Sequence, residues 1–241
     1  RSRKGVCDDF ADLFKAMAEK AGLAAEKIGG WSKGYGYMAG TKFGQPDHAW
    51  NAVFIDDEWH LLDVTWAEGF GETKNGKLKT TKKFKGGWFD TAPAEFVFKH
   101  LPSDPKWQLL EKPLTLAEYE NLPVAGPELF ALGYDSARLL AEARSGKSVE
   151  FPMVFDHPFA IKAVSAPYQK AFSLGSPLKL QFECRDCAAM AAFSDGIITD
   201  FDKKGKAFSL TFRPSPGPLR IFAKKNKNDR RFQGVMEFDI L

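Results

Sequence analysis

The segment that decides the fold is HAWNAVFIDDEWHLLDVTW, residues 48–66. Apolar and polar residues alternate along residues 48–55, which is typical of a half-buried β-strand. Asp56 and Asp57 offer a two-residue turn, and a second strand is expected over residues 59–66. The segment therefore predicts a β-hairpin.

The pairing of this hairpin determines which side chains share a face. With a two-residue turn, Ile55 lies opposite Glu58. Trp50 then lies opposite Asp63, and His48 projects from the same face. His48 and Asp63 become diagonal neighbours, roughly 7–8 Å apart at the backbone, which allows an imidazole–carboxylate hydrogen bond. A turn longer by one residue would place Asp63 on the other face unless a β-bulge restored the phase.

An amphipathic helix is predicted upstream, beginning after Cys7 and ending at Gly22. Its apolar residues repeat at spacings of three and four, so they are expected to form one buried face. These residues are Phe10, Leu13, Phe14, Met17 and Ala21.

Cys7 is therefore expected at or just before the start of a helix. The free N–H groups and the positive dipole end there favour a thiolate, and the Cys7 N–H is a candidate oxyanion donor. Asp8 and Asp9 oppose the thiolate, and we expect an imidazole to outweigh them. A buried structural cysteine is the alternative interpretation.

The other histidines are expected to have structural or surface roles. His60 falls on the opposite parity from Asp63, which favours a packed or surface side chain. His100 and His157 lie beside or near prolines in segments predicted to be loops, where each is expected to be structural or exposed.

Four motifs carry a resemblance to a known family. The first is Gly-Val-Cys at residues 5–7, leading into a helix; HAWN at 48–51 and WHLLDVTW at 59–66 follow. These three resemble the transglutaminase-like superfamily of papain-related Cys-His-Asp proteins. The run FVFKHLPSDPKWQLL, residues 96–110, resembles the segment that follows the core in the kyphoscoliosis-peptidase branch.

This resemblance implies a Cys-His-Asp catalytic triad. Cys7 would be the nucleophile, His48 the general base and acid, and Asp63 the carboxylate that orients the imidazole. The expected reaction is acyl transfer on protein or peptide amides through a thioester, with no metal and no organic cofactor. Hydrolysis and cross-linking share that intermediate, and hydrolysis is expected because no dedicated amine site is visible in the sequence.

Aromatic residues near the motifs are candidates to line a substrate cleft, with core packing as the alternative interpretation. They are Trp31, Tyr35, Tyr37 and Trp50.

Family members usually carry a sizeable segment before the nucleophile, often with a second oxyanion donor, whereas this chain starts six residues before Cys7. The N-terminal part of the domain is therefore expected to be missing, and an enzyme without it would be weakened or inactive. A catalytically inactive interaction module is thus the rival hypothesis. A glycan-amide hydrolase is a third, for which no sugar-binding cleft is identified.

Composition describes a globular chain of 241 residues with 44% hydrophobic and 27% charged residues. The net charge of +3 does not favour nucleic-acid binding, and the basic runs at 82–85 and 224–231 are expected to be solvated loops. No apolar run approaches the ~18–20 residues of a membrane span. The sequence leaves oligomeric state and compartment open, with an exported location slightly favoured over a cytoplasmic one.

The remaining cysteines form the motif Cys184-Arg185-Asp186-Cys187. A zinc site would need further ligands, and the segment follows a predicted strand, unlike a thioredoxin-type motif. Two reduced cysteines are expected. A local disulfide is the alternative if the protein is exported.

The second half of the chain has a different pattern. Seven short apolar or alternating runs, separated by turn residues, begin at about residue 149 and predict an immunoglobulin-like β-sandwich. The expected architecture is thus α+β: a papain-like transglutaminase-like domain over residues 1–125, followed by the sandwich over 126–241. A short helix is predicted at 115–121, with Thr115 and Glu118 as a capping box.

Overall fold

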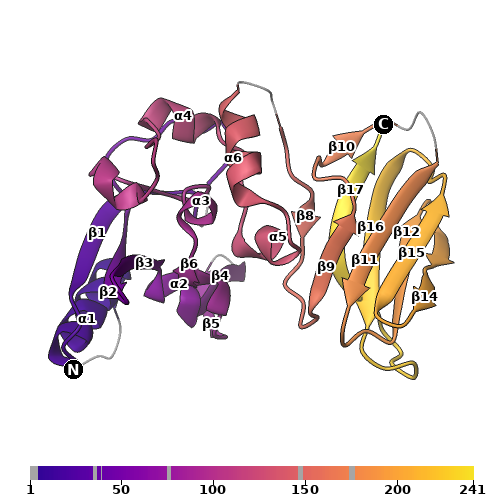
Figure 1. Ribbon diagram of the computed structural model, residues 1–241, viewed down its shortest axis with the longest axis horizontal. Coiled ribbons are helices and arrows are strands. Elements are labelled where there is room, and N and C mark those ends of the chain that lie inside the picture. The colour runs from indigo at the N-terminus through magenta and orange to yellow at the C-terminus, as the bar shows by residue number, and fades with distance from the viewer. Residues whose placement is uncertain (1–4, 35–36, 39, 75–76, 146–148, 174–176) are drawn as a thin grey trace. The chain divides into compact units, whose positions relative to one another are not determined.

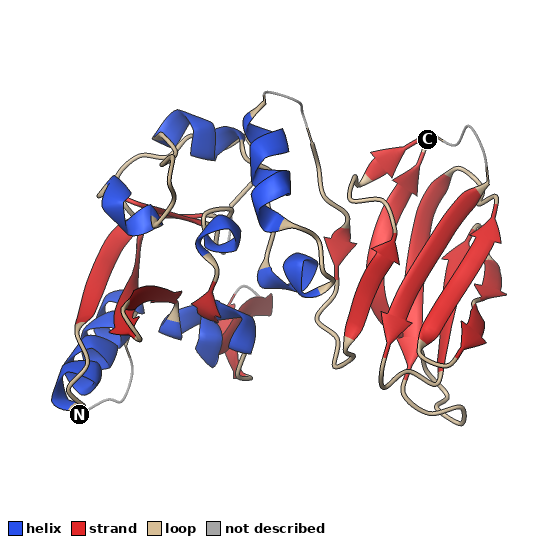
Figure 2. Cartoon of the chain, viewed as in Figure 1, coloured by secondary structure: helices blue, strands red, loops and turns tan. Residues whose placement is uncertain are grey.

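The computed structural model describes residues 5–34, 37–38, 40–74, 77–145, 149–173 and 177–241. The chain divides into two compact units, and the α+β composition predicted from the sequence is present. The first unit comprises Arg1–Pro127 with Leu140–Arg144, and the second Glu128–Leu139 with Ser145–Leu241. Figure 2 shows that helices end with α6 and that strands follow. The predicted division at residue 125 stays a prediction.

The first unit is built around a five-stranded antiparallel sheet in the order β6-β3-β2-β1-β7 (Figure 1). Its strands are β1 (Ala25–Ser32), β2 (His48–Ile55), β3 (Glu58–Leu62), β6 (Phe89–Thr91) and β7 (His100–Pro102), with a separate hairpin of β4 (Gly69–Lys74) and β5 (Lys77–Lys82). Its helices are α1 (Cys7–Lys20), α2 (Val64–Glu68), α3 (Pro93–Phe96) and α4 (Leu116–Asn121), with 3₁₀ turns η1 (Gly86–Trp88) and η2 (Pro105–Gln108).

The predicted hairpin register is confirmed. Ile55 pairs with Glu58 and Asn51 with Leu62, across a turn in which Asp56 and Asp57 both have positive φ. The predicted end of the second strand is wrong. β3 stops at Leu62, and the residues from Val64 onward form α2, because the Asp63 side chain accepts the first free N–H groups of that helix.

The predicted buried face of α1 is also wrong. The helix buries Ala11 and Ala18, whereas Leu13 and Met17 are 59% and 63% exposed. Ala18 packs with Val53 in a cluster that also contains Ala25 and Leu62, and Phe14 packs against it. Small side chains allow the helix to lie close to β2, so its larger apolar residues turn away from the sheet.

The far end of β1 is anchored by a buried lysine. Lys33 is 1% exposed, and its Nζ donates to the carbonyl oxygens of Tyr119 at 2.7 Å and Leu122 at 2.6 Å. The Lys33 N–H also donates to the carbonyl of Lys99, next to His100. Burial lowers the pKa of Lys33 to about 7. These bonds hold the ends of β1 and α4 together, and α4 begins at the predicted Thr115–Glu118 capping box.

Two helices, α5 (Pro127–Ala131) and α6 (Ser136–Arg144), precede the strands of the second unit. One sheet has the order β10-β17-β16-β12-β13, with β8 beside β17, and the other the order β14-β15-β11-β9. These strands are β8 (Met153–Val154), β9 (Ile161–Ser165), β10 (Ala171–Phe172), β11 (Leu178–Cys184), β12 (Ala189–Ser194), β13 (Ile197–Asp200), β14 (Asp202–Lys204), β15 (Ala207–Phe212), β16 (Gly217–Lys224) and β17 (Gln233–Ile240).

Each of the seven predicted runs contains a strand, and the short strands β10, β13 and β14 were not predicted. Buried residues alternate along β11, where Leu178, Leu180 and Phe182 face inward. That pattern suits a sheet covered on one face, and Figure 1 shows the two sheets as two layers. The immunoglobulin-like topology stays a prediction.

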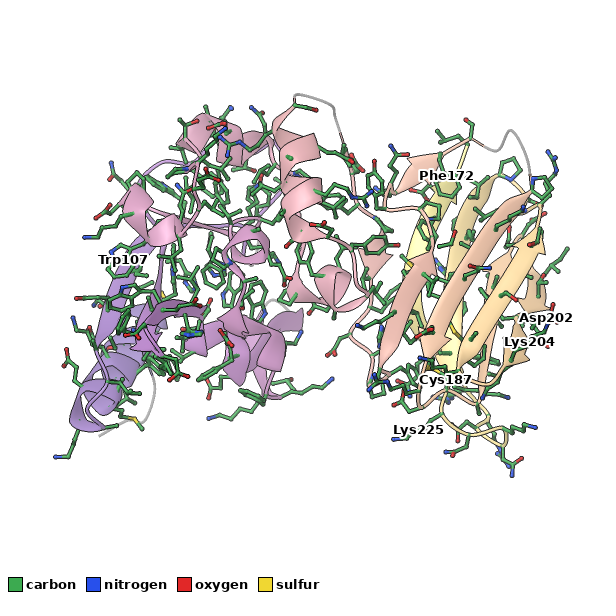
Figure 3. All side chains as sticks on the ribbon, in the orientation of Figure 1. Trp107, Phe172, Cys187, Asp202, Lys204 and Lys225 are labelled. Atoms are coloured by element: carbon green, nitrogen blue, oxygen red, sulfur yellow. A yellow bond between two sulfur atoms is a disulfide. The ribbon has the colours of Figure 1, made fainter. Side chains whose placement is uncertain are left out.

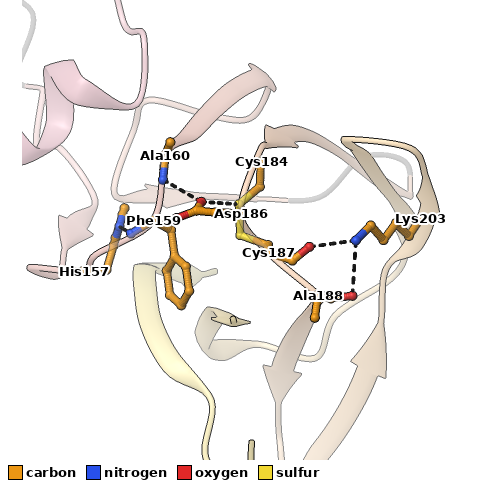
Figure 4. The surroundings of a disulfide bond; sticks show 8 residues. All are labelled: His157, Phe159, Ala160, Cys184, Asp186, Cys187, Ala188 and Lys203. Carbon is orange, nitrogen blue, oxygen red and sulfur yellow. Dashed lines mark hydrogen bonds between the residues drawn. A yellow bond between two sulfur atoms is a disulfide. The ribbon is translucent and has the colours of Figure 1, made fainter. Parts of the chain in front are cut away.

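The expectation of two reduced cysteines in the second unit is wrong. Cys184 and Cys187 form a disulfide at the end of β11, with their Cα atoms 5.5 Å apart (Figures 3 and 4). The turn between them is held by Asp186, whose Oδ1 accepts the Ala160 N–H, and by Lys203, whose Nζ donates to the Cys187 carbonyl. The tight turn brings the two sulfur atoms within bonding distance, which strand periodicity alone does not reveal.

Candidate active site

Asp63 lies at the centre of the candidate site. It follows β3 and is the N-cap residue of α2, so its Oδ1 accepts the N–H groups of Thr65 at 2.9 Å and Trp66 at 3.0 Å. The side chain is fully buried. A buried carboxylate must have its oxygens satisfied, and the helix start satisfies one of them here.

The other oxygen of Asp63 binds two imidazoles. His48 Nε2 lies 2.8 Å and His100 Nε2 3.0 Å from Oδ2. Burial alone would raise the pKa of Asp63, but the hydrogen bonds from His100 and His48 hold it at about 2. The carboxylate is therefore ionised at neutral pH and acts as an acceptor in all four hydrogen bonds.

The predicted contact between His48 and Asp63 is thus present in the structure. Because an ionised carboxylate only accepts, His48 Nε2 carries the proton of that hydrogen bond. Its other nitrogen, Nδ1, has no hydrogen-bond partner among the described residues. Nδ1 is therefore the atom of His48 that is available to take a proton.

His100 was expected in a loop, structural or exposed, and the structure places it in β7 with only 1% exposure. β7 pairs with β1, so that Ser32 lies opposite His100, while Gly30 lies opposite His48 on the other neighbouring strand. Both imidazoles are therefore on the same face of the sheet, on either side of β1. Only the pairing of strands far apart in sequence reveals this.

Gly30 explains how rings from two non-adjacent strands can meet. A Cβ at this position would collide with the Leu101 carbonyl and would lie 2.6 Å from Trp50 Cη2. The absence of a side chain therefore leaves room for Trp50 and His100, whose ring centroids are 5.0 Å apart. A glycine within a strand is a signal of such a close approach, although not of its partner.

Cys7 is the first residue of α1 and is a free, partly exposed thiol. The Ala11 carbonyl accepts a hydrogen bond from Asn51 Nδ2, and Ala18 packs with Val53, so α1 and β2 run in the same direction. The Cys7 end of the helix therefore lies toward the His48 end of the strand. Asn51 faces the helix, whereas the alternation of β2 places His48 with Trp50 on the opposite face. Among the described residues no hydrogen bond joins the Cys7 thiol to His48.

The two acidic residues after Cys7 are engaged in local contacts. Asp8 Oδ1 lies 2.9 Å from Lys27 Nζ, and Asp9 Oδ2 accepts the Val6 N–H at 2.9 Å. Hydrogen bonds from Lys27 to Asp12 and Asp8 raise the pKa of that lysine. These exposed pairs contribute little to stability, but they place a positive charge beside the start of the helix.

The cleft candidates have different environments. Trp50 is fully buried, with its ring 6.0 Å from that of His48, so it lies under the imidazoles and not on an open surface. Trp31 is partly buried and donates to the Gly44 carbonyl. Tyr37 is partly buried and stacks on Phe43. Tyr35 lies outside the described residues.

The ligand atoms of His48, Asp63 and His100 lie within 4.8 Å of one another, a spacing that a metal ion could also use. Here they bind one another. The remaining histidine of this sheet, His60, is partly exposed and binds Asp90 at 2.7 Å. It lies at the surface, as its parity predicted.

Comparison with known proteins identifies this part of the chain. A family profile described as the Transglutaminase-like superfamily matches residues 1–64, which contain Cys7, His48 and Asp63. The first part of the chain belongs to the transglutaminase-like superfamily.

The curated relatives of this transglutaminase-like region point to one branch. Kyphoscoliosis peptidase of Mus musculus is 40% identical over 138 residues, which are 57% of this chain and 21% of the relative, and the Homo sapiens protein matches equally. Hillarin of Drosophila melanogaster is 35% identical over 145 residues, covering 55% of this chain and 18% of the relative. The region is therefore of the kyphoscoliosis-peptidase-like branch.

The chain spans about a fifth of the length of these transglutaminase-like relatives. Within its described residues, no helix is both long and apolar enough to cross a bilayer.

Proposed function

We propose that this chain catalyses cysteine-dependent acyl transfer on protein or peptide amides, with Cys7, His48 and Asp63 as its triad. The observation that carries the proposal is the His48–Asp63 pair. The buried carboxylate holds the imidazole by Nε2 and leaves Nδ1 as a base, at the end of β2 toward which the Cys7 end of α1 lies.

The proposed reaction has two halves that share one thioester. The Cys7 thiol gives its proton to His48 Nδ1, and the thiolate attacks the amide carbonyl carbon to form a tetrahedral oxyanion. The C–N bond then breaks, and the imidazolium gives its proton to the leaving amine. In the second half, water gives a proton to His48 while its oxygen attacks the thioester carbonyl carbon. The C–S bond then breaks, which releases a carboxylic acid, and the imidazolium returns its proton to the Cys7 sulfur.

Hydrolysis is the outcome we propose, although an amine could attack the same thioester. The name of the mammalian relatives, kyphoscoliosis peptidase, agrees with hydrolysis of a peptide bond. We propose that backbone N–H groups at the start of α1, including that of Cys7, donate to the oxyanion, because the first N–H groups of a helix have no partner within it.

We further propose that the second unit is an immunoglobulin-like sandwich that binds or positions a protein partner, by fold-level analogy. Its disulfide supports an exported location, because such bonds persist in oxidising compartments.

The rival function is an inactive interaction module with the same fold. Two observations favour it: no hydrogen bond joins the Cys7 thiol to His48 among the described residues, and α1, which carries Cys7, packs on the face of β2 opposite that of His48. Catalytic hydrogen bonds are often long in the absence of substrate, so the geometry of the free chain does not exclude the triad.

Labelling of Cys7 with iodoacetamide separates the two functions. Cys184 and Cys187 are joined in a disulfide, so Cys7 is the thiol that reacts. If His48 is its base, His48→Ala slows alkylation at pH 7 by ~10-fold or more, because the fraction of thiolate falls. Mass spectrometry of the labelled peptide against time gives the rates.

The matched control is His60→Ala, which removes a histidine of the same hairpin that binds a different aspartate. This variant should label at the wild-type rate. Equal rates for wild type, His48→Ala and His60→Ala would leave Cys7 as an ordinary thiol and would favour the interaction module.

A further inference from the structure

We propose that His100 is a positioning residue of this site: it binds the second lone pair of Asp63 Oδ2 and thereby fixes the carboxylate that orients His48. This inference deepens the proposed function and rests on it for its meaning in catalysis. The arrangement of the two imidazoles can nevertheless be measured without any activity.

The first argument is that Asp63 has no free acceptor position left. Its Oδ1 accepts two backbone N–H groups, from Thr65 and Trp66, and its Oδ2 accepts from His48 and His100. A carboxylate offers about four lone-pair positions, and all four are filled. Removal of the His100 donor therefore frees one position on the same atom that holds His48.

The second argument concerns the protonation state of His100. Burial lowers its pKa to about 4, although Asp63 opposes this shift. The ring is therefore neutral at pH 7, and the proton must be on Nε2 to bind the ionised carboxylate. Nδ1 is then an acceptor, and among the described residues this buried atom has no partner. His100 thus supplies one donor to Asp63 without adding a charge.

The third argument is that aromatic side chains fix the orientation of the His100 ring. Phe96 of α3 stacks on it with centroids 4.0 Å apart and an angle of 16° between planes. Trp50 and Trp88 meet it edge to face, at 5.0 Å and 5.4 Å. A ring held in this way cannot flip about its Cβ–Cγ bond, which would put Cε1 in the place of Nε2, so the hydrogen bond to Asp63 keeps one geometry.

The consequence concerns the tautomer of His48. A carboxylate held at four points presents one lone pair to His48 Nε2, which keeps the proton on Nε2 and leaves Nδ1 as the base. If Asp63 can rotate, both tautomers of His48 become populated, and the fraction with a basic Nδ1 falls.

The direct test is ¹⁵N NMR of the imidazoles at pH 7. The chain has four histidines, and one substitution at each assigns its signals. In the wild type, His48 and His100 should both show a protonated Nε2 and an unprotonated Nδ1. In His100→Phe, which keeps an aromatic ring against Phe96 but has no donor, His48 should show a mixture of tautomers. His100→Gln restores a neutral N–H donor and should return His48 toward the wild-type pattern.

A second readout uses the rate of Cys7 alkylation against pH. His100→Phe should lower the rate at pH 7 by ~10-fold, the size expected for one hydrogen bond to a charged group. It should also move the acid limb of the profile to higher pH, because the hydrogen bond from His100 helps to keep the pKa of Asp63 low. His100→Gln should recover part of both effects.

The proposal is overturned if His48 keeps its wild-type tautomer in His100→Phe, or if the normalised pH profiles coincide while only stability changes. If Cys7 of the wild type is alkylated slowly, and at the same rate when His48 is replaced, the proposed function is overturned instead. In that case the tautomer of His48 in the two His100 variants would still decide whether His100 positions the pair.

Discussion

Two histidine–aspartate pairs in the first unit have nearly the same length and opposite surroundings. His48 and Asp63 lie 2.8 Å apart with side chains 7% and 0% exposed, whereas His60 and Asp90 lie 2.7 Å apart with side chains 29% and 71% exposed. Distance alone therefore does not distinguish a candidate catalytic pair from a surface ion pair.

The difference lies in what else each pair touches. His60 Nε2 faces the Ile55 carbonyl at 3.3 Å, so both of its nitrogens have partners and the pKa of this imidazole is raised, chiefly by the hydrogen bond to Asp90. Among the described residues, Nδ1 of His48 has no hydrogen-bond partner, and its partner Asp63 is held by three further donors. A base needs an unoccupied nitrogen, which only the buried pair provides.

The largest effect should come from removing each aspartate. Asp63→Ala leaves two buried imidazoles and two N–H groups of α2 without their acceptor, and should lower the free energy of unfolding by ~3–5 kcal/mol. Asp90→Ala removes an exposed partner and should cost under ~1 kcal/mol.

Urea unfolding followed by tryptophan fluorescence measures this difference. All six tryptophans belong to the first unit, so the signal reports on that unit alone; they are Trp31, Trp50, Trp59, Trp66, Trp88 and Trp107. Similar losses in both aspartate variants would show that burial does not distinguish the two pairs.

A second effect should come from the glycine that allows the buried rings to meet. Gly30→Ala forces a methyl group against the Leu101 carbonyl and the Trp50 ring, and should cost ~2–3 kcal/mol. Gly29→Ala is the matched control, because nothing lies within 4 Å of its added Cβ. The same fluorescence assay applies, and equal stability of the two variants would contradict the packing described for Gly30.

Lowering the pH should destabilise the chain through His100, which binds Asp63, and stabilise it through His60, which binds Asp90. The pKa of His100 is about 4 in the folded chain and 6.5 in a free imidazole, so between these values the unfolded chain binds a proton that the folded chain does not. The free energy of unfolding should therefore fall by up to ~3 kcal/mol as the pH falls from 6.5 to 4. His60, whose pKa is raised, stabilises the folded chain below pH 6.5 and loses this effect as the pH rises through its folded pKa, by a smaller amount because it is exposed.

Lys33 changes the free energy of unfolding over a different pH range from the histidines. Its pKa of about 7 lies below its ordinary 10.5, so stability should rise between pH 7 and pH 10.5 and be unaffected by this group near pH 5. Urea midpoints from pH 4.5 to 6 thus report on His100 without a contribution from the titration of Lys33. A wild-type slope that persists in His100→Phe would contradict the assignment to His100.

Much of the candidate site follows from local sequence. The Asp56–Asp57 turn sets the register of the hairpin, and the register brings His48 and Asp63 to the same face, as predicted. The N-cap preference of aspartate was the missed local signal, since it ends β3 and starts α2 where a longer strand was expected. The seven strand-forming runs of the second unit were likewise visible in the sequence.

Other features depended on contacts between distant segments. The apolar spacing of α1 predicted Leu13 and Met17 in the core, but the close approach of Ala11 and Ala18 to β2 turned them outward. His100 was predicted to lie in a loop. The structure places it in a strand because β7 pairs with β1, some seventy residues away along the chain.

The sequence by itself determined the hairpin, the pairing of His48 with Asp63 and the placement of Cys7 at a helix start, because periodicity, turn residues and helix signals act over a few residues. Only the tertiary structure decided that a second imidazole fills the last acceptor position of Asp63, and that Cys184 and Cys187 are joined. Those outcomes depend on distances between atoms that the chain brings together only on folding.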